Sequence, residues 1–296
     1  MAHPTQVKTV TVDNGVEVFY REASPTAVRD VSALPIIVLL HGFPSSSFQF
    51  RNLIPILATQ YRVVAPDLPG YGFTVVPEGR KYQYTFESIT NTIAGFLDAL
   101  EIKKFSVYAF DYGAPTAWRL ALQRPKAITA IISQNGNAYE EGFGGEFWAP
   151  VKKLWENPSK ENFAALEQVT SLGVTKWQYE HGSQNAWAIP PETYHLDYYL
   201  MTRPGNAKIQ ADLLMDYRNN VKMYPEFQKY FREYKPPLLA VWGKNDAIFV
   251  PPGAEAFKRN NPNATVKFVD DGHFALESAV EKIGHDILEF LQEQRI

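Results

Sequence analysis

Short, continuous apolar runs recur along this chain, and they limit what it can fold into more than any other feature. They occupy residues 35–40, 61–65, 105–110, 127–132, 237–242 and 265–269. Runs of this length predict strands that are buried on both faces of a parallel sheet. Segments with helical periodicity lie between several of them, at residues 85–100, 115–123 and 278–294. This alternation predicts an α/β fold with a doubly wound, mostly parallel sheet.

The chain opens differently, with alternating residues on either side of a turn sequence. Residues 7–12 and 16–20 alternate in character and flank Asp13-Asn14-Gly15. An Asn-Gly pair between two such runs is typical of a tight β-hairpin. We therefore expect two antiparallel strands before the parallel part of the sheet.

The regular alternation stops between residues 136 and 235. This stretch is rich in tyrosine, tryptophan and phenylalanine, and it contains breaks such as Pro204-Gly205. It predicts an inserted lid made of short helical pieces, with residues 1–135 and 236–296 forming the core. A lid over the carboxyl ends of parallel strands encloses the position where α/β proteins bind ligands.

Composition excludes several classes of function. With 29 basic and 32 acidic residues, the 296-residue chain has a net charge of about -3, which gives no basic surface for nucleic acid. There is no cysteine, so disulfides and a cysteine nucleophile are excluded. Residues 1–12 have no apolar signal segment, and no apolar run is long enough to span a membrane, so we expect a cytoplasmic protein, monomeric or homodimeric.

The strand at residues 105–110 is followed by almost no loop before the next helix. The sequence there is Ala109-Phe-Asp111-Tyr-Gly113, with Pro115 in the first helical turn. This fits the nucleophile-elbow pattern, in which small residues flank a nucleophile held on a sharp turn. A helix cap is the simpler interpretation of Asp111. Pro115 fits either interpretation, because the first helical turn tolerates a residue without an N–H.

Two downstream residues favour the catalytic interpretation. Asp246 follows the apolar run at 237–242, and His273 follows the run at 265–269. Nucleophile, acid and histidine in this chain order, each at the carboxyl end of a strand, form the triad of hydrolases with this fold. A metal site is not expected, since Asp270, Asp271 and His273 have no second histidine at ligand spacing, and no cofactor is expected.

At these residues the sequence resembles the α/β-hydrolase superfamily, over nearly the whole chain and most weakly in the insertion. An aspartate at the elbow is similar to the epoxide hydrolase and haloalkane dehalogenase branch. His41-Gly-Phe-Pro44 resembles the oxyanion-hole motif of that branch, and the sequence from Asp67 to Gly72 resembles its next segment. The chain departs from the pattern at Ala109 and at Tyr112, where dehalogenases usually have tryptophan to hold the halide.

The resemblance implies a two-step reaction. A carboxylate is already anionic and can attack saturated carbon, which leaves an ester on Asp111. His273, oriented by Asp246, then activates water against that ester, with the amides of Phe43 and Tyr112 as the oxyanion donors.

An epoxide oxygen also needs an acid, and the resemblance implies lid tyrosines for this role. Tyr217 lies in a Tyr-Arg-Asn segment of the epoxide hydrolase type, and Tyr179 is the second candidate. Four other tyrosines could substitute, namely Tyr139, Tyr194, Tyr198 and Tyr199. The expected contacts to a small hydrophobic substrate are His41, Pro44, Trp177 and Phe274.

The leading hypothesis is an epoxide hydrolase that makes vicinal diols. A haloalkane dehalogenase would use the same Asp111 ester, with Trp177 or Asn135 holding the halide. A haloacid dehalogenase would need an arginine beside the nucleophile, where this chain has Tyr112. A third class is a non-hydrolytic protein that binds a hydrophobic ligand or guides a biosynthetic rearrangement under the lid.

Overall fold

The computed structural model of the protein describes residues 1–12, 15–28 and 31–296. Its strands lie in one eight-stranded sheet. They are β1 (Gln6–Val12), β2 (Val16–Ala23), β3 (Ile36–Leu40), β4 (Arg62–Pro66), β5 (Phe105–Phe110), β6 (Ile128–Gln134), β7 (Leu238–Gly243) and β8 (Thr265–Val269). The predicted apolar runs therefore form strands, and the predicted fold class is confirmed.

The sheet has the order β1-β2-β4-β3-β5-β6-β7-β8. Strands β1 and β2 pair antiparallel, as expected from the alternating residues, and β2 also pairs antiparallel with β4. The pairs from β4 through β3, β5, β6 and β7 to β8 are all parallel. The expected turn falls on Asp13 and Asn14, which lie outside the described residues. Strand order reverses around β3, so β3 and β5 flank the point where ligands bind in open α/β sheets.

The main helices are α1 (Leu53–Leu57), α2 (Phe86–Ala99), α3 (Gly113–Gln123), α4 (Gly145–Glu156), α5 (Lys160–Leu166), α6 (Leu172–Glu180), α7 (Pro191–Met201), α8 (Asn206–Tyr234), α9 (Pro252–Asn260) and α10 (Val280–Glu293). Short 3-10 helices are found at Val31–Ala33, Ser47–Phe50, Glu78–Arg80, Glu140–Gly142, Glu167–Thr170 and Ala186–Ala188. None of the helices in the described ranges combines the length and the apolar character needed to cross a membrane.

Each face of the sheet has its own apolar core, as the period of two along a strand requires. Along β5, Val107 and Ala109 belong to the core that also contains residues of α2, α3, α8 and α9. Tyr108 and Phe110 point to the other face and pack in the core with residues of α1 and α10. Burial on both faces holds β5 in the sheet. Asp111, the residue after Phe110, therefore lies at the carboxyl edge of the sheet.

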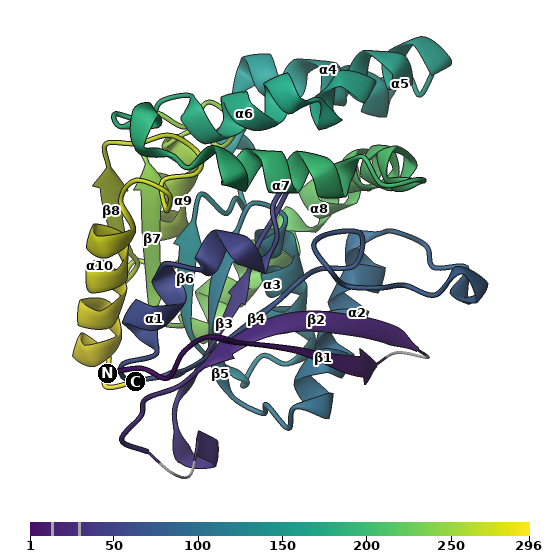
Figure 1. The fold of residues 1–296 in the computed structure, drawn as a ribbon. Helices are drawn as coiled ribbons and strands as arrows, with labels where there is room; N and C mark the ends of the chain where they lie inside the picture. The colour runs from purple at the N-terminus through teal and green to yellow at the C-terminus, as the bar shows by residue number, and fades with distance from the viewer. Residues whose placement is uncertain (13–14, 29–30) are drawn as a thin grey trace.

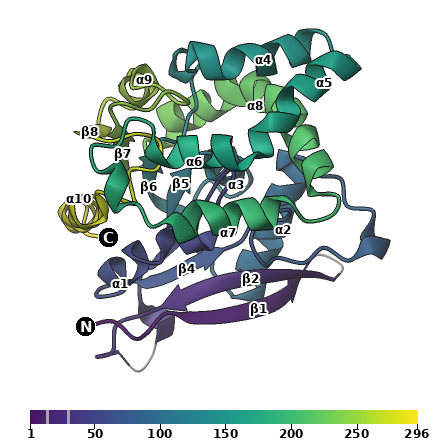
Figure 2. The same cartoon turned by 45° about the horizontal axis from the view of Figure 1, so that its top comes forward.

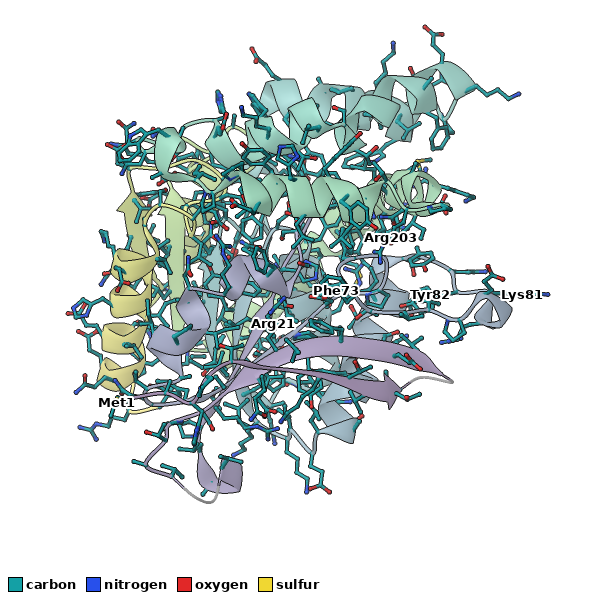
Figure 3. The ribbon with its side chains drawn as sticks, in the orientation of Figure 1. Met1, Arg21, Phe73, Lys81, Tyr82 and Arg203 are labelled. Carbon is teal, nitrogen blue, oxygen red and sulfur yellow. The ribbon has the colours of Figure 1, made fainter. Side chains whose placement is uncertain are left out.

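Helices α4 to α8, residues 145–234, lie over the carboxyl ends of the parallel strands (Figures 1 and 2). We refer to them as the helical layer. The space between this layer and the sheet is filled with side chains (Figure 3). The sequence predicted only short helical pieces here, which is wrong for α8, because this helix has 29 residues and runs through Pro225. Buried residues along one face of α8, including Tyr217, Tyr224 and Phe231, stabilise the helix beyond the hydrogen bond that proline removes.

Candidate active site

Asp111 lies at the sharp turn between β5 and α3, at the carboxyl edge of the sheet. Its φ of 47° is in the left-handed region, which side-chain-bearing residues rarely adopt. The turn allows no side chain two residues on, since a Cβ on Gly113 would lie 2.2 Å from the carbonyl oxygen of Leu40. The backbone thus has the strained geometry expected of a nucleophile elbow, with the aspartate side chain held over the strand ends.

The contacts of the Asp111 carboxylate differ from those of a helix cap. Tyr112 is the N-cap residue of α3, and no side-chain hydrogen bond caps this helix. Instead, Asp111 Oδ1 accepts a hydrogen bond of 2.6 Å from the backbone N–H of Phe43, which lies after β3. The amide of Tyr112 lies close enough to this carboxylate to lower the pKa of Asp111. The two predicted oxyanion donors therefore both face the Asp111 carboxyl group.

His273 and Asp246 lie beside Asp111, on the loops after β8 and β7. His273 Nδ1 is 2.8 Å from Asp246 Oδ2, and His273 Nε2 is 3.7 Å from Asp111 Oδ2. Nε2 has no hydrogen-bond partner among the described residues, although the imidazole is buried. A water or a substrate atom between Nε2 and Asp111 would meet both groups. The structure thus brings together the three residues that the chain order predicted.

Burial and nearby charges shift the pKa values of Asp111 and His273. Burial raises the pKa of Asp111 to about 6, against the opposing effects of His273 and of the Phe43 and Tyr112 amides. Burial alone would lower the pKa of His273, but the charge and hydrogen bond of Asp246, together with the charge of Asp111, raise it. Asp111 is therefore ionised at neutral pH, and the histidine is basic enough to take a proton from water.

Asn135, directly after β6, also contacts the acid of the triad. Its Nδ2 donates a 2.6 Å hydrogen bond to Asp246 Oδ2, and its Oδ1 accepts from the backbone N–H of Gly243 at 3.1 Å. Gln134 donates to the same Oδ1 and also to the carbonyl oxygen of His273. The Asn135 amide oxygen thus accepts two hydrogen bonds, and one of the two Nδ2 hydrogens is used on Asp246. The sequence signal that could identify Asn135 as a site residue is its position directly after a sheet strand.

Tyr217 of α8 lies next to the residue that follows the nucleophile. Its ring centroid is 5.6 Å from that of Tyr112 and 4.8 Å from that of Trp148. The hydroxyl is fully buried and makes no hydrogen bond within the described part of the chain. Burial raises the pKa of Tyr217, with additional contributions from Tyr224 and Asp111. Although Tyr224 is close enough to affect that pKa, the geometry of the two hydroxyls does not form a hydrogen bond.

Tyr179 of α6 has a different environment. Its hydroxyl donates to Oδ2 of Asp197 on α7, and its ring stacks on Phe274 with centroids 3.8 Å apart. Burial raises the pKa of both Tyr179 and Asp197. The hydroxyl therefore already has a partner, and the ring contacts Phe274, the neighbour of His273.

The substitute tyrosines have other surroundings. Tyr139 packs against Phe257 with centroids 5.2 Å apart, and Tyr194 packs against Tyr179. Tyr199 is 70% exposed, and Tyr198 is partly buried on the same helix.

Of the four predicted substrate-contacting residues, three lie in the loops that carry Phe43 and His273, namely His41, Pro44 and Phe274. His41 is buried, with Nδ1 at 3.1 Å from the Gly42 carbonyl oxygen and Nε2 accepting from the Leu68 N–H at 2.9 Å. This histidine supports the loop that carries the Phe43 amide, and Pro44 follows in the same loop after a cis peptide bond. Phe274 packs against Phe110 beside the catalytic histidine.

Trp177 is farther along the helical layer. It lines an apolar cleft of about 480 Å³ together with Phe147, Pro150, Leu166, His181 and Ala247. Ala247 directly follows Asp246 in sequence, so the cleft opens beside the loop that carries Asp246.

The buried indoles offer no free N–H for a halide. Trp118, Trp148, Trp155 and Trp242 each donate to a backbone carbonyl oxygen. The remaining two, Trp177 and Trp187, are 36% and 87% exposed.

Comparisons with known proteins agree with this architecture. The family model described as alpha/beta hydrolase fold matches residues 35–280. An uncharacterized hydrolase of Saccharomyces cerevisiae is 44% identical over 287 residues, which cover 96% of this chain and 96% of the yeast protein.

More distant relatives include two enzymes with named activities. An epoxide hydrolase of Caballeronia sordidicola is 23% identical over 300 residues, covering 90% of each chain. A haloalkane dehalogenase of Psychrobacter cryohalolentis is 26% identical over 297 residues, covering 95% of this chain and 89% of its own. The family match spans most of the chain and the yeast relative matches almost all of it, so this protein is a hydrolase of the alpha/beta hydrolase family.

Proposed function

We propose that this hydrolase opens small hydrophobic epoxides to vicinal diols through an ester on Asp111. The observation that carries the proposal is the arrangement around the Asp111 carboxylate. Its Oδ1 accepts the Phe43 amide at 2.6 Å, and its Oδ2 lies 3.7 Å from the unpartnered Nε2 of His273. One oxygen is thus held by an oxyanion donor while the other faces the base. This arrangement suits a nucleophile whose ester is later hydrolysed.

In the first step, an Asp111 oxygen attacks an epoxide carbon, and the bond from that carbon to the ring oxygen breaks. The electron pair goes to the ring oxygen, which takes the phenol proton of Tyr217. This step leaves a hydroxyalkyl ester on Asp111 and a phenolate at Tyr217. The tyrosine suits this role because its buried hydroxyl has no partner in the described structure and its raised pKa keeps it protonated at neutral pH.

In the second step, His273 Nε2 takes a proton from water, and the resulting hydroxide adds to the acyl carbon of the Asp111 ester. The Phe43 and Tyr112 amides donate to the oxyanion that forms; removing one donor of this kind typically costs about 3 kcal/mol. Collapse releases the diol, whose oxygen takes the proton from His273. The new Asp111 acid returns its proton to the Tyr217 phenolate, so atoms and charge balance.

The helical layer completes this site as a cap. In the proposal, residues 136–235 form the lid, and residues 1–135 and 236–296 form the catalytic core. The arrangement over the strand ends, with Tyr217 supplied by α8, supports this division (Figures 1 and 2).

Dehalogenation is the alternative, since it needs the same Asp111 ester and a relative of that activity covers most of the chain. A departing halide needs donors but no proton. Of the two expected donors, Trp177 lines the cleft beside Ala247, and Asn135 already donates one Nδ2 hydrogen to Asp246, which disfavours this alternative. A ligand-binding protein without turnover would have no use for a base 3.7 Å from the carboxylate.

The test is the intact mass of a His273→Ala variant after brief exposure to a panel of epoxides and alkyl halides. The proposal expects a mass increase of one epoxide, located at Asp111 by peptide mapping. The Asp111→Asn variant is the matched control and should remain unmodified. Adducts from halides alone would favour the dehalogenase, and the absence of any adduct would contradict covalent catalysis.

A further inference from the structure

Tyr112 contributes more to the site than its backbone amide. Its side chain is 3% exposed and lies among aromatic rings, with centroids 4.9 Å from Phe86, 5.6 Å from Tyr217 and 6.0 Å from Phe43. The amide of the same residue lies close enough to the Asp111 carboxylate to lower the pKa of Asp111. The Tyr112 phenol thus lies between the nucleophile and the tyrosine of the helical layer.

The hydroxyl of Tyr112 differs from those of other buried tyrosines in this region. Tyr71 donates to Gln210 at 2.5 Å, Tyr108 donates to Gln134 at 3.0 Å, and Tyr179 donates to Asp197. No hydrogen bond among the described residues uses the hydroxyl of Tyr112, and the hydroxyl of its neighbour Tyr217 is also unpartnered. Leaving a buried hydroxyl unbonded costs about 1–3 kcal/mol. The buried hydroxyl of Tyr217 carries this cost, and together with the unbonded Tyr112 hydroxyl beside it, it indicates a place where a ligand atom supplies the missing acceptor.

The direction of attack on the epoxide carbon predicts where the leaving oxygen, the acceptor for these hydroxyls, lies. When a carboxylate oxygen attacks a ring carbon, the bond that breaks points away from the attacking oxygen. The leaving oxygen therefore emerges on the side of the site opposite Asp111, toward the helical layer that carries Tyr217. An alkoxide has lone pairs for more than one donor, and two phenols stabilise its charge better than one.

We infer that Tyr112 is the second hydrogen-bond donor to the epoxide oxygen and acts together with Tyr217. This inference rests on the proposed function and assigns to Tyr112 the role of second proton donor for which Tyr179 was the candidate. Tyr217 transfers its proton as the ring opens, while Tyr112 keeps its own and donates a hydrogen bond to the same oxygen. Burial and the nearby Asp111 charge raise the pKa of Tyr112, so it keeps its proton throughout the neutral range.

The experiment compares Tyr112→Phe with Tyr139→Phe in single turnovers with excess enzyme. The Tyr139 hydroxyl is also buried and unbonded within the described structure, but its ring packs against Phe257 instead of Tyr217. Rapid quenching and intact mass give the rates at which the Asp111 ester forms and disappears. Tyr112→Phe should slow ester formation about 10- to 1,000-fold, with hydrolysis of the ester changed less than about threefold. Tyr139→Phe should match the native protein in both steps.

Because the Tyr112 side chain contacts Tyr217, the two effects should not be additive. We expect the Tyr112→Phe/Tyr217→Phe double variant to lose less than the product of the two single losses. The amplitude of ester formation counts the folded sites, so partial unfolding lowers the amplitude and leaves the rate per site unchanged. If Tyr112→Phe yields no folded protein, 3-fluorotyrosine at position 112 keeps the ring and strengthens the donor, which should speed ester formation about two- to fivefold.

Native rates of ester formation in Tyr112→Phe, with slow formation in Tyr217→Phe, would overturn the role of Tyr112 and leave the epoxide hydrolase standing. An unchanged rate with 3-fluorotyrosine would overturn it equally. If the native protein forms no ester with any epoxide, both the inference and the proposed function fail.

Discussion

Asn135 and His273 donate to the same oxygen of Asp246: Asn135 Nδ2 is 2.6 Å and His273 Nδ1 is 2.8 Å from Asp246 Oδ2. The other oxygen of this carboxylate accepts from the backbone N–H of Ile248 at 2.7 Å. Both oxygens of Asp246 are therefore held, and Asn135 contacts the same oxygen as His273.

Removing the Asn135 amide should slow only the second chemical step. Its φ of 50° favours glycine over alanine as the replacement, because glycine adopts this conformation without strain. Asn135→Gly should lower the rate of ester hydrolysis about tenfold, since Asp246 is less firmly oriented, and leave ester formation nearly unchanged. Single-turnover mass spectrometry separates the two rates, with Asp246→Asn as the reference for complete loss of the acid. Equal slowing of both steps would mean that Asn135 shapes the site rather than the acid.

Tyr179→Phe should reduce stability more than catalysis. The variant keeps the ring that stacks on Phe274 but removes the donor to the buried Asp197. An unsatisfied buried acceptor costs about 1–3 kcal/mol in the free energy of unfolding, which denaturant titration can measure. Ester formation per folded site should stay within about threefold of native. If ester formation slowed as much as in Tyr217→Phe while stability stayed unchanged, Tyr179 would be a proton donor in the reaction.

Formation of the ester should depend on pH through the ionisation of Asp111. Its pKa of about 6 means that the attacking carboxylate disappears as the pH falls below that value. We expect the single-turnover rate at pH 5 to be about a tenth of the rate at pH 8. The raised pKa values of Tyr112 and Tyr217 predict no fall on the alkaline side up to about pH 10. A rate that is flat from pH 5 to 8 would contradict the assignment of Asp111.

The raised pKa of Asp111 should also lower the free energy of unfolding at neutral pH. A carboxyl group whose pKa is raised on folding destabilises the native state above that pKa, and the penalty vanishes below the unfolded value. For a change from 3.8 to about 6, the penalty is at most about 3 kcal/mol. Asp111→Asn should therefore be more stable than the native protein at pH 8, and the difference should shrink toward pH 4. Denaturant midpoints at both pH values test this, and a gain that persists at pH 4 would rule out the charge as its cause.

Much of the fold was predictable because burial on two faces leaves an unmistakable apolar run. Strand β5, buried along its whole length, begins and ends at the predicted residues. Strand β8 has the predicted bounds as well, but the burial expected on both faces is wrong for it, because it lies at the edge of the sheet and only Val269 is buried. The proximity of Asp111, Asp246 and His273 was predictable because each follows a strand, and the carboxyl ends of these strands meet at one edge of the sheet. Helix α9, by contrast, has only nine residues and begins at Pro252, directly after Pro251, and it was not predicted.

The rest of the site depends on packing between segments that are distant in sequence. Tyr179 was a candidate acid because of its residue type and its place in the insertion, but the packing of α6 against α7 directs its hydroxyl to Asp197. The side-chain environment of Tyr112 depends on α2 and α8, which contribute Phe86 and Tyr217. The pattern around Asp111 predicted the amide of Tyr112, whereas the use of its phenol requires the positions of those helices.

The account depends most on Asp111 as the nucleophile, and an isotope experiment tests this directly. Excess native enzyme is allowed a single turnover of an epoxide in heavy-oxygen water, and both the product and the peptide containing Asp111 are weighed. The prediction is one heavy oxygen in the Asp111 carboxylate and none in the first diol released, because the diol oxygen comes from the aspartate. Heavy oxygen in the first diol with an unlabelled Asp111 would show that water attacks the epoxide directly, and the covalent mechanism would be wrong.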